Sequence, residues 1–299
     1  MKVAALDLGT NTFLLLIAEV TNGAIQKVLH DEVQVVRLGQ RVHENRRFHP
    51  EALKRADDCF TSFSRTIRSH GVEKILACAT SAARDVTNGA DLISLGDTHG
   101  IPIEIISGVR EAELTFLGTI DDASSGPVRI IDVGGGSTEI ISGEGKKLLS
   151  RTSVDVGSVR LTEIFVSRHP IPESELDQMR TYLTEKFSNA AGLADSRAKV
   201  IAVAGTPTTL ATVEQGLAFE SERVHGFLMS VERLKFWARQ LAGMSVEERQ
   251  GLAGMEPKRA DVIVAGALTL LSAAETLGAT TLQVSVRGLR YGVARTLGA

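Results

Sequence analysis

An internal duplication limits the folds open to this chain more than any other feature of its 299-residue sequence. The segment Asp7-Leu8-Gly9-Thr10-Asn11-Thr12 has a counterpart 125 residues later in Asp132-Val133-Gly134-Gly135-Gly136-Ser137-Thr138. Three more pairs follow in the same order at offsets of 122 to 125: residues 36–38 with 159–161, 50–51 with 172–173, and 74–79 with 199–204. Ordered matches at nearly one offset indicate a repeated structural unit. We therefore expect two copies of one domain, at residues 1–123 and 124–299.

Each copy contains the same succession of strands and helices. A strand rich in β-branched residues leads into a glycine- and hydroxyl-rich turn, and a second strand leaves that turn at residues 13–19 or 140–142. A third strand (32–38; 154–161), an amphipathic helix with a proline at its start, a buried strand (75–79; 200–204) and another helix follow. Alternating buried strands and amphipathic helices predict an α/β fold.

The second copy carries additional elements. Helices are expected at about residues 230–241 and 257–277, then a strand at 281–286 and a last helix, about 287–299, that returns to the first domain. Residues 121–127 have the Asp, Ser, Gly and Pro composition of a linker. The expected architecture is two α/β domains facing each other across a cleft.

Composition and charge exclude several classes of partner. The net charge of −3 provides no global positive field, so neither DNA, RNA nor an anionic membrane is an expected partner, and any polyanion must be bound locally.

The longest apolar stretch, residues 262–274, is too short to span a bilayer. The N-terminus reaches Asp7 too early to contain the apolar core of a signal peptide, which predicts a cytoplasmic location. Cys59 and Cys78 have no CxxC spacing and are expected to be buried thiols.

The two duplicated turns have the chemistry of phosphate-binding loops. Glycine allows close approach of the backbone, neighbouring N–H groups point inward, and hydroxyl groups add donors. The aspartate before each turn, Asp7 or Asp132, is placed to hold a cation or its water. A plain hairpin turn is the alternative for either copy alone, but two copies favour phosphate binding. The predicted phosphate-binding residues are Gly9, Thr10, Asn11 and Thr12 in the first copy and Gly134, Gly135, Gly136, Ser137 and Thr138 in the second.

A third candidate turn contains Gly205 and Thr206 and lies between a buried strand and a helix. A helix N-terminus binds anions through its unpaired N–H groups, so both residues are also predicted to bind phosphate. Locally the turn is equally consistent with Thr206 as the helix N-cap and Pro207 as the first helical residue.

These motifs together resemble a known family. The segments 7–12, 79–84, 107–112, 132–139, 157–161, 204–210 and 286–292 are similar to the exopolyphosphatase / guanosine pentaphosphate phosphohydrolase (Ppx/GppA) family. That family has the ribonuclease H-like fold of the actin, Hsp70 and sugar kinase superfamily. The similarity extends over essentially the whole chain, in family order. Long members carry further C-terminal domains, so this chain looks like the short, two-domain form.

The resemblance implies specific roles for individual residues. It identifies Glu111 as the catalytic base that orients and deprotonates water, Glu139 as a second acid beside the same water and metal, and Arg84 as a phosphate-binding residue. Asp132, with Glu139 and Asp7, is the expected metal-binding set. The expected ion is Mg²⁺, with K⁺ as a candidate monovalent cation, and the expected assembly is a homodimer. The implied substrates are inorganic polyphosphate and the stringent-response nucleotide guanosine pentaphosphate.

Simpler interpretations of these residues remain open at this point. Glu111 also suits the first turn of a helix, where the dipole favours acids, and Arg84 could form a surface pair with Asp85. The roles of Arg259, Arg287, Arg290 and His225 are undecided. Two other functions stay in view, a metabolite kinase of the same superfamily and a nucleotide-sensing protein without catalysis. The joint presence of Glu111, Asp132 and Glu139 favours an enzyme that hydrolyses phosphoanhydrides.

Overall fold

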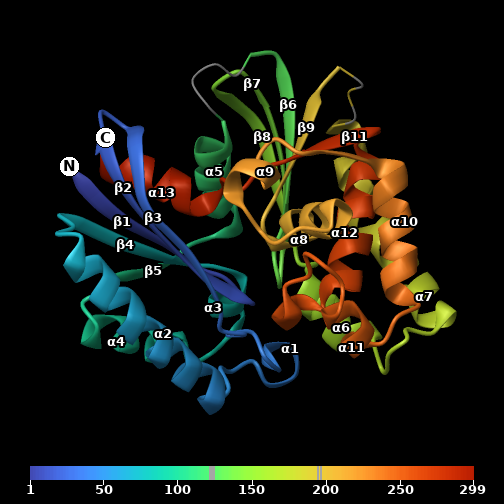
Figure 1. Ribbon diagram of the computed structural model, residues 1–299, viewed down its shortest axis with the longest axis horizontal. Coiled ribbons are helices and arrows are strands. Elements are labelled where there is room, and N and C mark those ends of the chain that lie inside the picture. The colour runs from blue at the N-terminus through green and yellow to red at the C-terminus, as the bar shows by residue number, and fades with distance from the viewer. Residues whose placement is uncertain (121–124, 194, 196) are drawn as a thin grey trace. The chain divides into compact units, whose positions relative to one another are not determined.

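The structure, a computed structural model, describes residues 1–120, 125–193, 195 and 197–299. These residues form two compact units, Met1–Thr119 with Gly288–Ala299 (unit 1) and Ile120–Arg287 (unit 2). The predicted boundary between residues 123 and 124 lies outside the described residues. Figure 1 shows the strands and helices of each unit.

Unit 1 is a five-stranded mixed sheet covered on both faces. Its strand order is β3-β2-β1-β4-β5, with β1 antiparallel to β2 and parallel to β4. The side chains of β1 alternate between two hydrophobic clusters: Ala4, Leu6 and Leu8 face one and Val3 and Ala5 the other. The strands are β1 (Lys2–Leu8), β2 (Thr12–Thr21), β3 (Ala24–Val35), β4 (Lys74–Ala79) and β5 (Ile103–Ile105); the helices are α1 (Val42–Asn45), α2 (Pro50–Ser69), α3 (Ser81–Asp85), α4 (Gly89–Thr98), α5 (Gly108–Thr119) and α13 (Leu289–Leu297).

Unit 2 has a six-stranded sheet in the order β10-β11-β9-β6-β7-β8. Its central helix, α12, is buried over most of its length and packs against α6, α7, α8 and α10. The strands are β6 (Pro127–Val133), β7 (Thr138–Glu144), β8 (Lys147–Val154), β9 (Lys199–Val203), β10 (Leu228–Ser230) and β11 (Thr281–Val284); the helices are α6 (Ser158–Phe165), α7 (Glu173–Phe187), η1 (Ser188–Leu193), α8 (Gly205–Gln215), α9 (Ser221–Val224), α10 (Val231–Ala242), α11 (Val246–Gln250), η2 (Pro257–Arg259) and α12 (Ile263–Thr276).

The two sheets share one topology, and the α/β class expected from the sequence is confirmed. The order β3-β2-β1-β4-β5 in unit 1 corresponds to β8-β7-β6-β9-β11 in unit 2, which adds β10 at its edge. The duplicated turns also close in the same way. The Gly9 amide donates to the Thr12 carbonyl at 3.0 Å, and the Gly134 amide donates to the Ser137 carbonyl at 3.0 Å.

Two element predictions in unit 2 were wrong. The strand expected at 154–161 ends at Val154, because the amides of Ser158 and Val159 donate to the carbonyls of Gly134 and Gly135 and residues 158–165 turn into α6. The helix expected at 257–277 is divided into η2 and α12.

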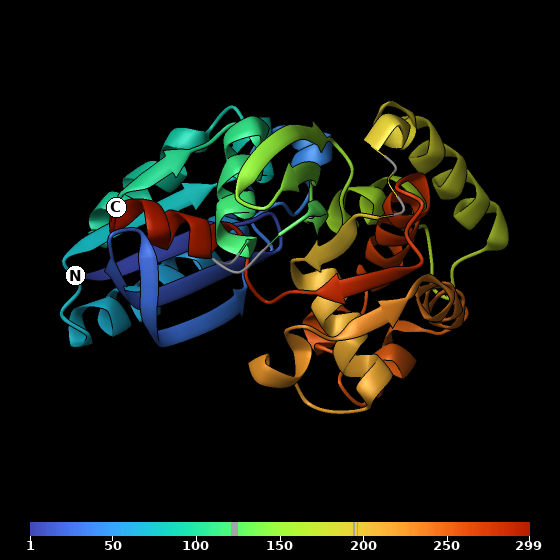
Figure 2. The same cartoon turned by 90° about the horizontal axis from the view of Figure 1, so that it is seen from above.

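The C-terminal helix α13 completes unit 1, where it lies beside α5 and β1 (Figures 1 and 2). Glycines allow the close crossing of α13 and α5. A Cβ at Gly292 would overlap the carbonyl of Leu114, and one at Gly118 would overlap the carbonyl of Gly288. No helix in the described part of the chain combines the length and apolarity needed to cross a bilayer.

Candidate active site

The predicted residues of unit 1 gather where its parallel strands end. Asp7 lies near the carboxyl end of β1, and the turn Gly9–Thr12 follows it directly. Thr10 and Asn11 are buried, and neither Thr10 Oγ1 nor Asn11 Nδ2 has a hydrogen-bond partner among the described residues. A buried donor without a partner costs on the order of 1–3 kcal/mol. The turn therefore contains two buried polar groups that the described protein atoms do not satisfy.

Arg84 and Glu111 form an ion pair in the same unit. Arg84, in the last turn of α3, donates from Nη1 to Glu111 Oε2 at 2.7 Å and to the Ile106 carbonyl at 3.0 Å. Glu111 lies in the first turn of α5 and is only 9% exposed. Arg84 thus forms a largely buried pair with Glu111, 27 residues further along the chain. A carboxylate held this way is fixed in one orientation.

Acidic groups of unit 1 act electrostatically on the buried thiol of Cys78, which lies on β4. Burial, followed by the charges of Asp7 and Glu104, raises the pKa of the Cys78 thiol to about 12, and Glu111 adds to the effect. Burial and the charge of Glu32 also raise the pKa of Cys59 to about 12. Both cysteines are buried free thiols, as the sequence predicted.

In unit 2 three polar residues form one row across the sheet. Asp132 on β6 is the register partner of Glu139 on β7, which in turn is the partner of Ser153 on β8. Directly opposite residues of antiparallel strands point to the same face, and two like charges there are unfavourable. Glu139 is 1% exposed, and the Ser153 hydroxyl donates to its Oε1 at 2.7 Å. Two carboxylates in this arrangement favour a bound cation.

The glycine turn beside this row is held by the segment before α6. Arg160 donates from its amide to the Gly135 carbonyl at 3.0 Å and from Nε to the Gly136 carbonyl at 2.7 Å. Arg160 thus holds the turn, a role that its place in the segment 157–161 did not reveal. Thr138, predicted to bind phosphate, donates its hydroxyl to the Val156 carbonyl at 2.8 Å and is fully buried, so this hydroxyl stabilises the fold.

The third turn also has an unusual backbone. Ala204 has φ 77° and ψ −170°, a conformation that costs a non-glycine residue on the order of 1–3 kcal/mol and is concentrated at functional sites. The helix α8 begins at Gly205, so the interpretation of Thr206 as N-cap and Pro207 as the first helical residue was wrong. The reason is packing: Thr206 is buried against Gly266 of α12, where a Cβ would overlap its hydroxyl.

Arg259 lies over the N-terminus of α8. Its guanidinium occupies the space that a Cβ at Gly205 would take. Burial lowers the pKa of Arg259 to about 10, so the side chain is charged at neutral pH. A cation at the positive end of a helix dipole is unfavourable by itself. The Arg259 guanidinium and the N-terminus of α8 together form a local positive site that suits an anion.

The other undecided residues have structural contacts. Arg290 donates to both carboxylate oxygens of Asp31 at 2.9 Å, which links α13 to β3. The Arg287 amide donates to the Ser285 hydroxyl at 3.1 Å, and the His225 amide donates to the Ser221 carbonyl at 2.8 Å at the end of α9.

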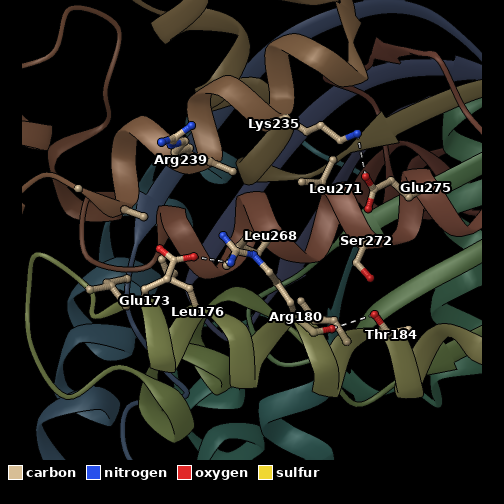
Figure 3. A pocket seen from close by; sticks show the side chains of 15 residues that line it. Glu173, Leu176, Arg180, Thr184, Lys235, Arg239, Leu268, Leu271, Ser272 and Glu275 are labelled. Atoms are coloured by element: carbon tan, nitrogen blue, oxygen red, sulfur yellow. Dashed lines mark hydrogen bonds and ion pairs between the residues drawn. The ribbon is translucent and has the colours of Figure 1, made fainter.

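A cavity of about 700 Å³ in unit 2 lies apart from these residues, between α7, α10 and α12 (Figure 3). Two ion pairs lie among its lining residues. Arg180 lies 2.7 Å from Glu173, and Lys235 lies 3.1 Å from Glu275. None of the predicted site residues lines this cavity. The candidate site residues of each unit lie instead near the strand ends of that unit's own sheet.

No group of three or more His, Cys, Asp or Glu side chains suited to a metal occurs among the residues that the structure describes. The Asp132–Glu139 pair is a smaller candidate set of metal ligands, with two carboxylates. Mg²⁺ commonly uses one or two carboxylates and completes its coordination with water and substrate phosphates. The donor set of the row therefore fits this ion.

Comparisons with known proteins agree with this chemistry. The chain is 36% identical to exopolyphosphatase 2 of Mycobacterium tuberculosis over 315 residues, covering 99% of this chain and 98% of that protein. A crystal structure of an exopolyphosphatase from Cytophaga hutchinsonii is similar with a TM-score of 0.89 at 29% identity, covering 99% of this chain and 97% of the other. The Aquifex aeolicus member of the Ppx/GppA family has a TM-score of 0.81 at 27% identity, with coverage of 99% and 97%. The model of the Ppx/GppA phosphatase family matches residues 16–297, and this chain belongs to that family.

Proposed function

We propose that this protein is an exopolyphosphatase, which hydrolyses the terminal phosphoanhydride of inorganic polyphosphate. Family membership and the exopolyphosphatases among its relatives support this proposal. The observation that carries it is the buried Glu111 carboxylate held 2.7 Å from Arg84, near the end of the strand that leads into a phosphate-type turn. Hydrolysis needs such a base, because water is a poor nucleophile until its proton is removed.

In this proposal Glu111 accepts the proton of the attacking water. The water oxygen forms a bond to the terminal phosphorus, the bridging P–O bond breaks, and the shortened chain leaves with the bridging oxygen. Arg84 holds Glu111 in one orientation, and its guanidinium can also contact phosphate. The charge that develops on the equatorial oxygens needs stabilisation by fixed donors.

Three groups of donors support phosphate binding. The turns Gly9–Thr12 and Gly134–Ser137 offer backbone N–H groups, and the first adds Thr10 Oγ1 and Asn11 Nδ2. The third group is the α8 N-terminus at Gly205 and Thr206 with the guanidinium of Arg259. Polyphosphate presents many phosphate groups, so it can use more than one set of donors.

We further propose Mg²⁺ as the cofactor. Asp132 and Glu139 would hold it, and Asp7 occupies the corresponding position in unit 1. When bound, the ion neutralises negative charge on the reacting phosphate. Guanosine pentaphosphate as a substrate, K⁺, a homodimer and a cytoplasmic location stay predictions.

The test is phosphate release in ¹⁸O-labelled water. We expect wild-type protein with Mg²⁺ to release phosphate from polyphosphate, with one ¹⁸O in each phosphate, and excess EDTA to stop the reaction. Guanosine pentaphosphate is tested in parallel. Phosphate without the label, or release that requires an organic acceptor, would instead favour the kinase. Full activity in EDTA would remove the metal from the mechanism.

The first mutational prediction concerns Glu111. Glu111→Gln retains shape and hydrogen bonding but cannot take a proton, so kcat should fall by about 10²–10⁴. Glu113→Gln is the matched control, because Glu113 lies on the same helix and pairs with the partly exposed Arg110. The control should stay near wild type. Near-wild-type turnover by Glu111→Gln would show that another group acts as the base.

A further inference from the structure

We propose that Ser153 is a positioning residue that fixes the orientation of the Glu139 carboxylate. This inference rests on the proposed function, in which Glu139 holds Mg²⁺ beside the reacting phosphate. Ser153 lies on β8, outside the duplicated glycine turn.

Ser153 and Glu139 form a short hydrogen bond, and the Glu139 side chain is buried. Ser153 Oγ lies 2.7 Å from Glu139 Oε1, and Glu139 is 1% exposed. The Ser153 hydroxyl donates this bond, and the Glu139 carboxyl oxygen accepts it. A separation of 2.7 Å is the usual length of a well-formed O–H···O bond. Because β7 and β8 are paired at these two residues, the backbone fixes the donor as well.

This bond sets how Glu139 is presented in its row. Asp132 is the register partner of Glu139 on the other side, on β6. A glutamate side chain has several rotamers, but a hydrogen bond to one oxygen selects those that place that oxygen toward β8. The plane of the carboxylate relative to Asp132 is then defined. Hydrogen bonds to ligating carboxylates orient metal ligands in this way in many proteins.

Comparison of the two copies shows that the polar row is not part of the shared scaffold. The register partners of Asp7 in unit 1 are Leu14 on β2 and then Val33 on β3. Leu14 corresponds to Glu139 and Val33 to Ser153. A stable sheet of this topology therefore needs neither the acid nor the serine. The serine occurs with the acid in the second copy, which points to a role in holding it.

The chain provides a matched control on the same strand. Ser150 also lies on β8 and hydrogen-bonds across to β7, but its partner is the Ser142 hydroxyl at 3.1 Å. Successive residues of a strand point to opposite faces, so Ser150 and Ser153, three apart, lie on opposite faces of the sheet. Ser150→Ala thus removes one hydroxyl and one cross-strand bond without changing the carboxylate row.

The experiment measures metal binding and kinetics on four full-length variants, Ser153→Ala, Ser153→Thr, Ser150→Ala and Glu139→Gln. Binding of Mn²⁺, as a substitute for Mg²⁺, is followed without substrate by the loss of the free-ion electron paramagnetic resonance signal. For Ser153→Ala we expect Mn²⁺ affinity and kcat on polyphosphate each to fall by about 10- to 100-fold. KM should change by less than about threefold, because other groups bind the phosphates. Ser153→Thr should regain most of both, and Ser150→Ala should match wild type.

Each result decides the proposal. Wild-type Mn²⁺ affinity and kcat in Ser153→Ala would overturn it, as would equal losses in Ser150→Ala. A lower melting temperature in Ser153→Ala with unchanged Mn²⁺ affinity would overturn it too, because it would indicate a structural role only. Absence of Mn²⁺ binding by wild type would also overturn it. Failure of wild type to hydrolyse polyphosphate would refute the proposed function, while the Mn²⁺ comparison would still test Ser153.

Discussion

Arg249 is a charged residue with no exposed surface, and its contacts determine the state of a neighbouring histidine. Its guanidinium donates to the carbonyls of Leu241, Met244 and Ala260 and to Nδ1 of His169 at 3.1 Å. Burial lowers the pKa of Arg249 to about 10, so it is protonated at neutral pH. Because a guanidinium only donates, His169 Nδ1 must accept, which requires a neutral imidazole.

This pair predicts a specific pH dependence of stability. Burial, followed by the charge of Arg249, lowers the pKa of His169 below its ordinary value. In the unfolded chain the His169 imidazole takes up a proton near pH 6.5, whereas in the folded protein it takes one up only at lower pH. The free energy of unfolding therefore falls as the pH drops below about 6.5. The loss continues until the pH reaches the lowered pKa of the folded state.

The measurement is urea unfolding of wild type and His169→Asn at about pH 7.5 and 5.5. The asparagine oxygen can accept from Arg249 but does not titrate. The variant should therefore lose less stability between the two pH values than wild type. Equal losses would mean that His169 is not the group responsible.

At the scale of elements, the close packing of Gly157 against the backbone of Gly135 and Gly136 holds the glycine turn of unit 2. A Cβ at Gly157 would lie 2.5–2.6 Å from backbone atoms of Gly135 and Gly136. Those atoms belong to the proposed phosphate-binding turn and have no side chain that could move aside. The turn must shift if this space is filled.

Gly157→Ala should therefore impair both stability and function. We expect a loss of about 1–3 kcal/mol from overpacking, and a fall in polyphosphate hydrolysis of at least about tenfold, because the turn is displaced. Gly192→Ala is the control, since nothing lies within 4 Å of its added Cβ. Thermal unfolding and kcat/KM on polyphosphate measure the two effects. Normal kinetics in Gly157→Ala would show that the turn tolerates displacement.

Most strands could be predicted from the sequence because their apolar residues are continuous and end at glycine-rich turns. The duplication gave the common order of elements, which the sheets confirm. The interval 154–161 was mistaken for one strand, since Val, Arg and Leu there fit either element. The helix forms there because two amides of α6 donate to the carbonyls of Gly134 and Gly135. These hydrogen bonds are tertiary contacts, which the local sequence does not reveal.

Part of the candidate site was also accessible from motifs. Sequence placed Asp132 and Glu139 in the same motif, and their pairing across two strands follows from the tight turn between them. The ion pair of Arg84 with Glu111 could not be derived, because 27 residues separate them and no local pattern links them. Arg160 and Ser153 were missed for the same reason: their partners lie on neighbouring elements, where periodicity gives no signal.

At the scale of the whole molecule, unit 1 is built from two distant parts of the chain. Asp31 on β3 receives two hydrogen bonds from Arg290, at 2.9 Å each, and one from the hydroxyl of Tyr291 at 3.0 Å. Burial alone would lower the pKa of Arg290. The charge and hydrogen bonds of Asp31 have the larger combined effect, and the pKa of Arg290 is raised. This contact ties α13 to the sheet.

Asp31→Asn should loosen α13 selectively. The substitution removes the Asp31 charge from its pair with the Arg290 guanidinium, which is 10% exposed, and this should cost about 2–3 kcal/mol. Amide hydrogen exchange should rise in residues 289–297 and stay unchanged in α7, which belongs to unit 2. Unchanged protection of α13 would show that its apolar contacts are sufficient.

The position of α13 has a consequence for synthesis on the ribosome. One face of the first sheet, with Val3, Ala5, Leu16, Ala18 and Val20, packs against Leu289, Val293 and Ala294. These strands leave the exit tunnel first, but α13 follows every residue of unit 2. At about 5–20 residues per second, the nascent chain carries this apolar face incompletely covered for on the order of ten seconds or more. Unit 2 is contiguous and can fold first, so the domain that is translated first is the last to be completed.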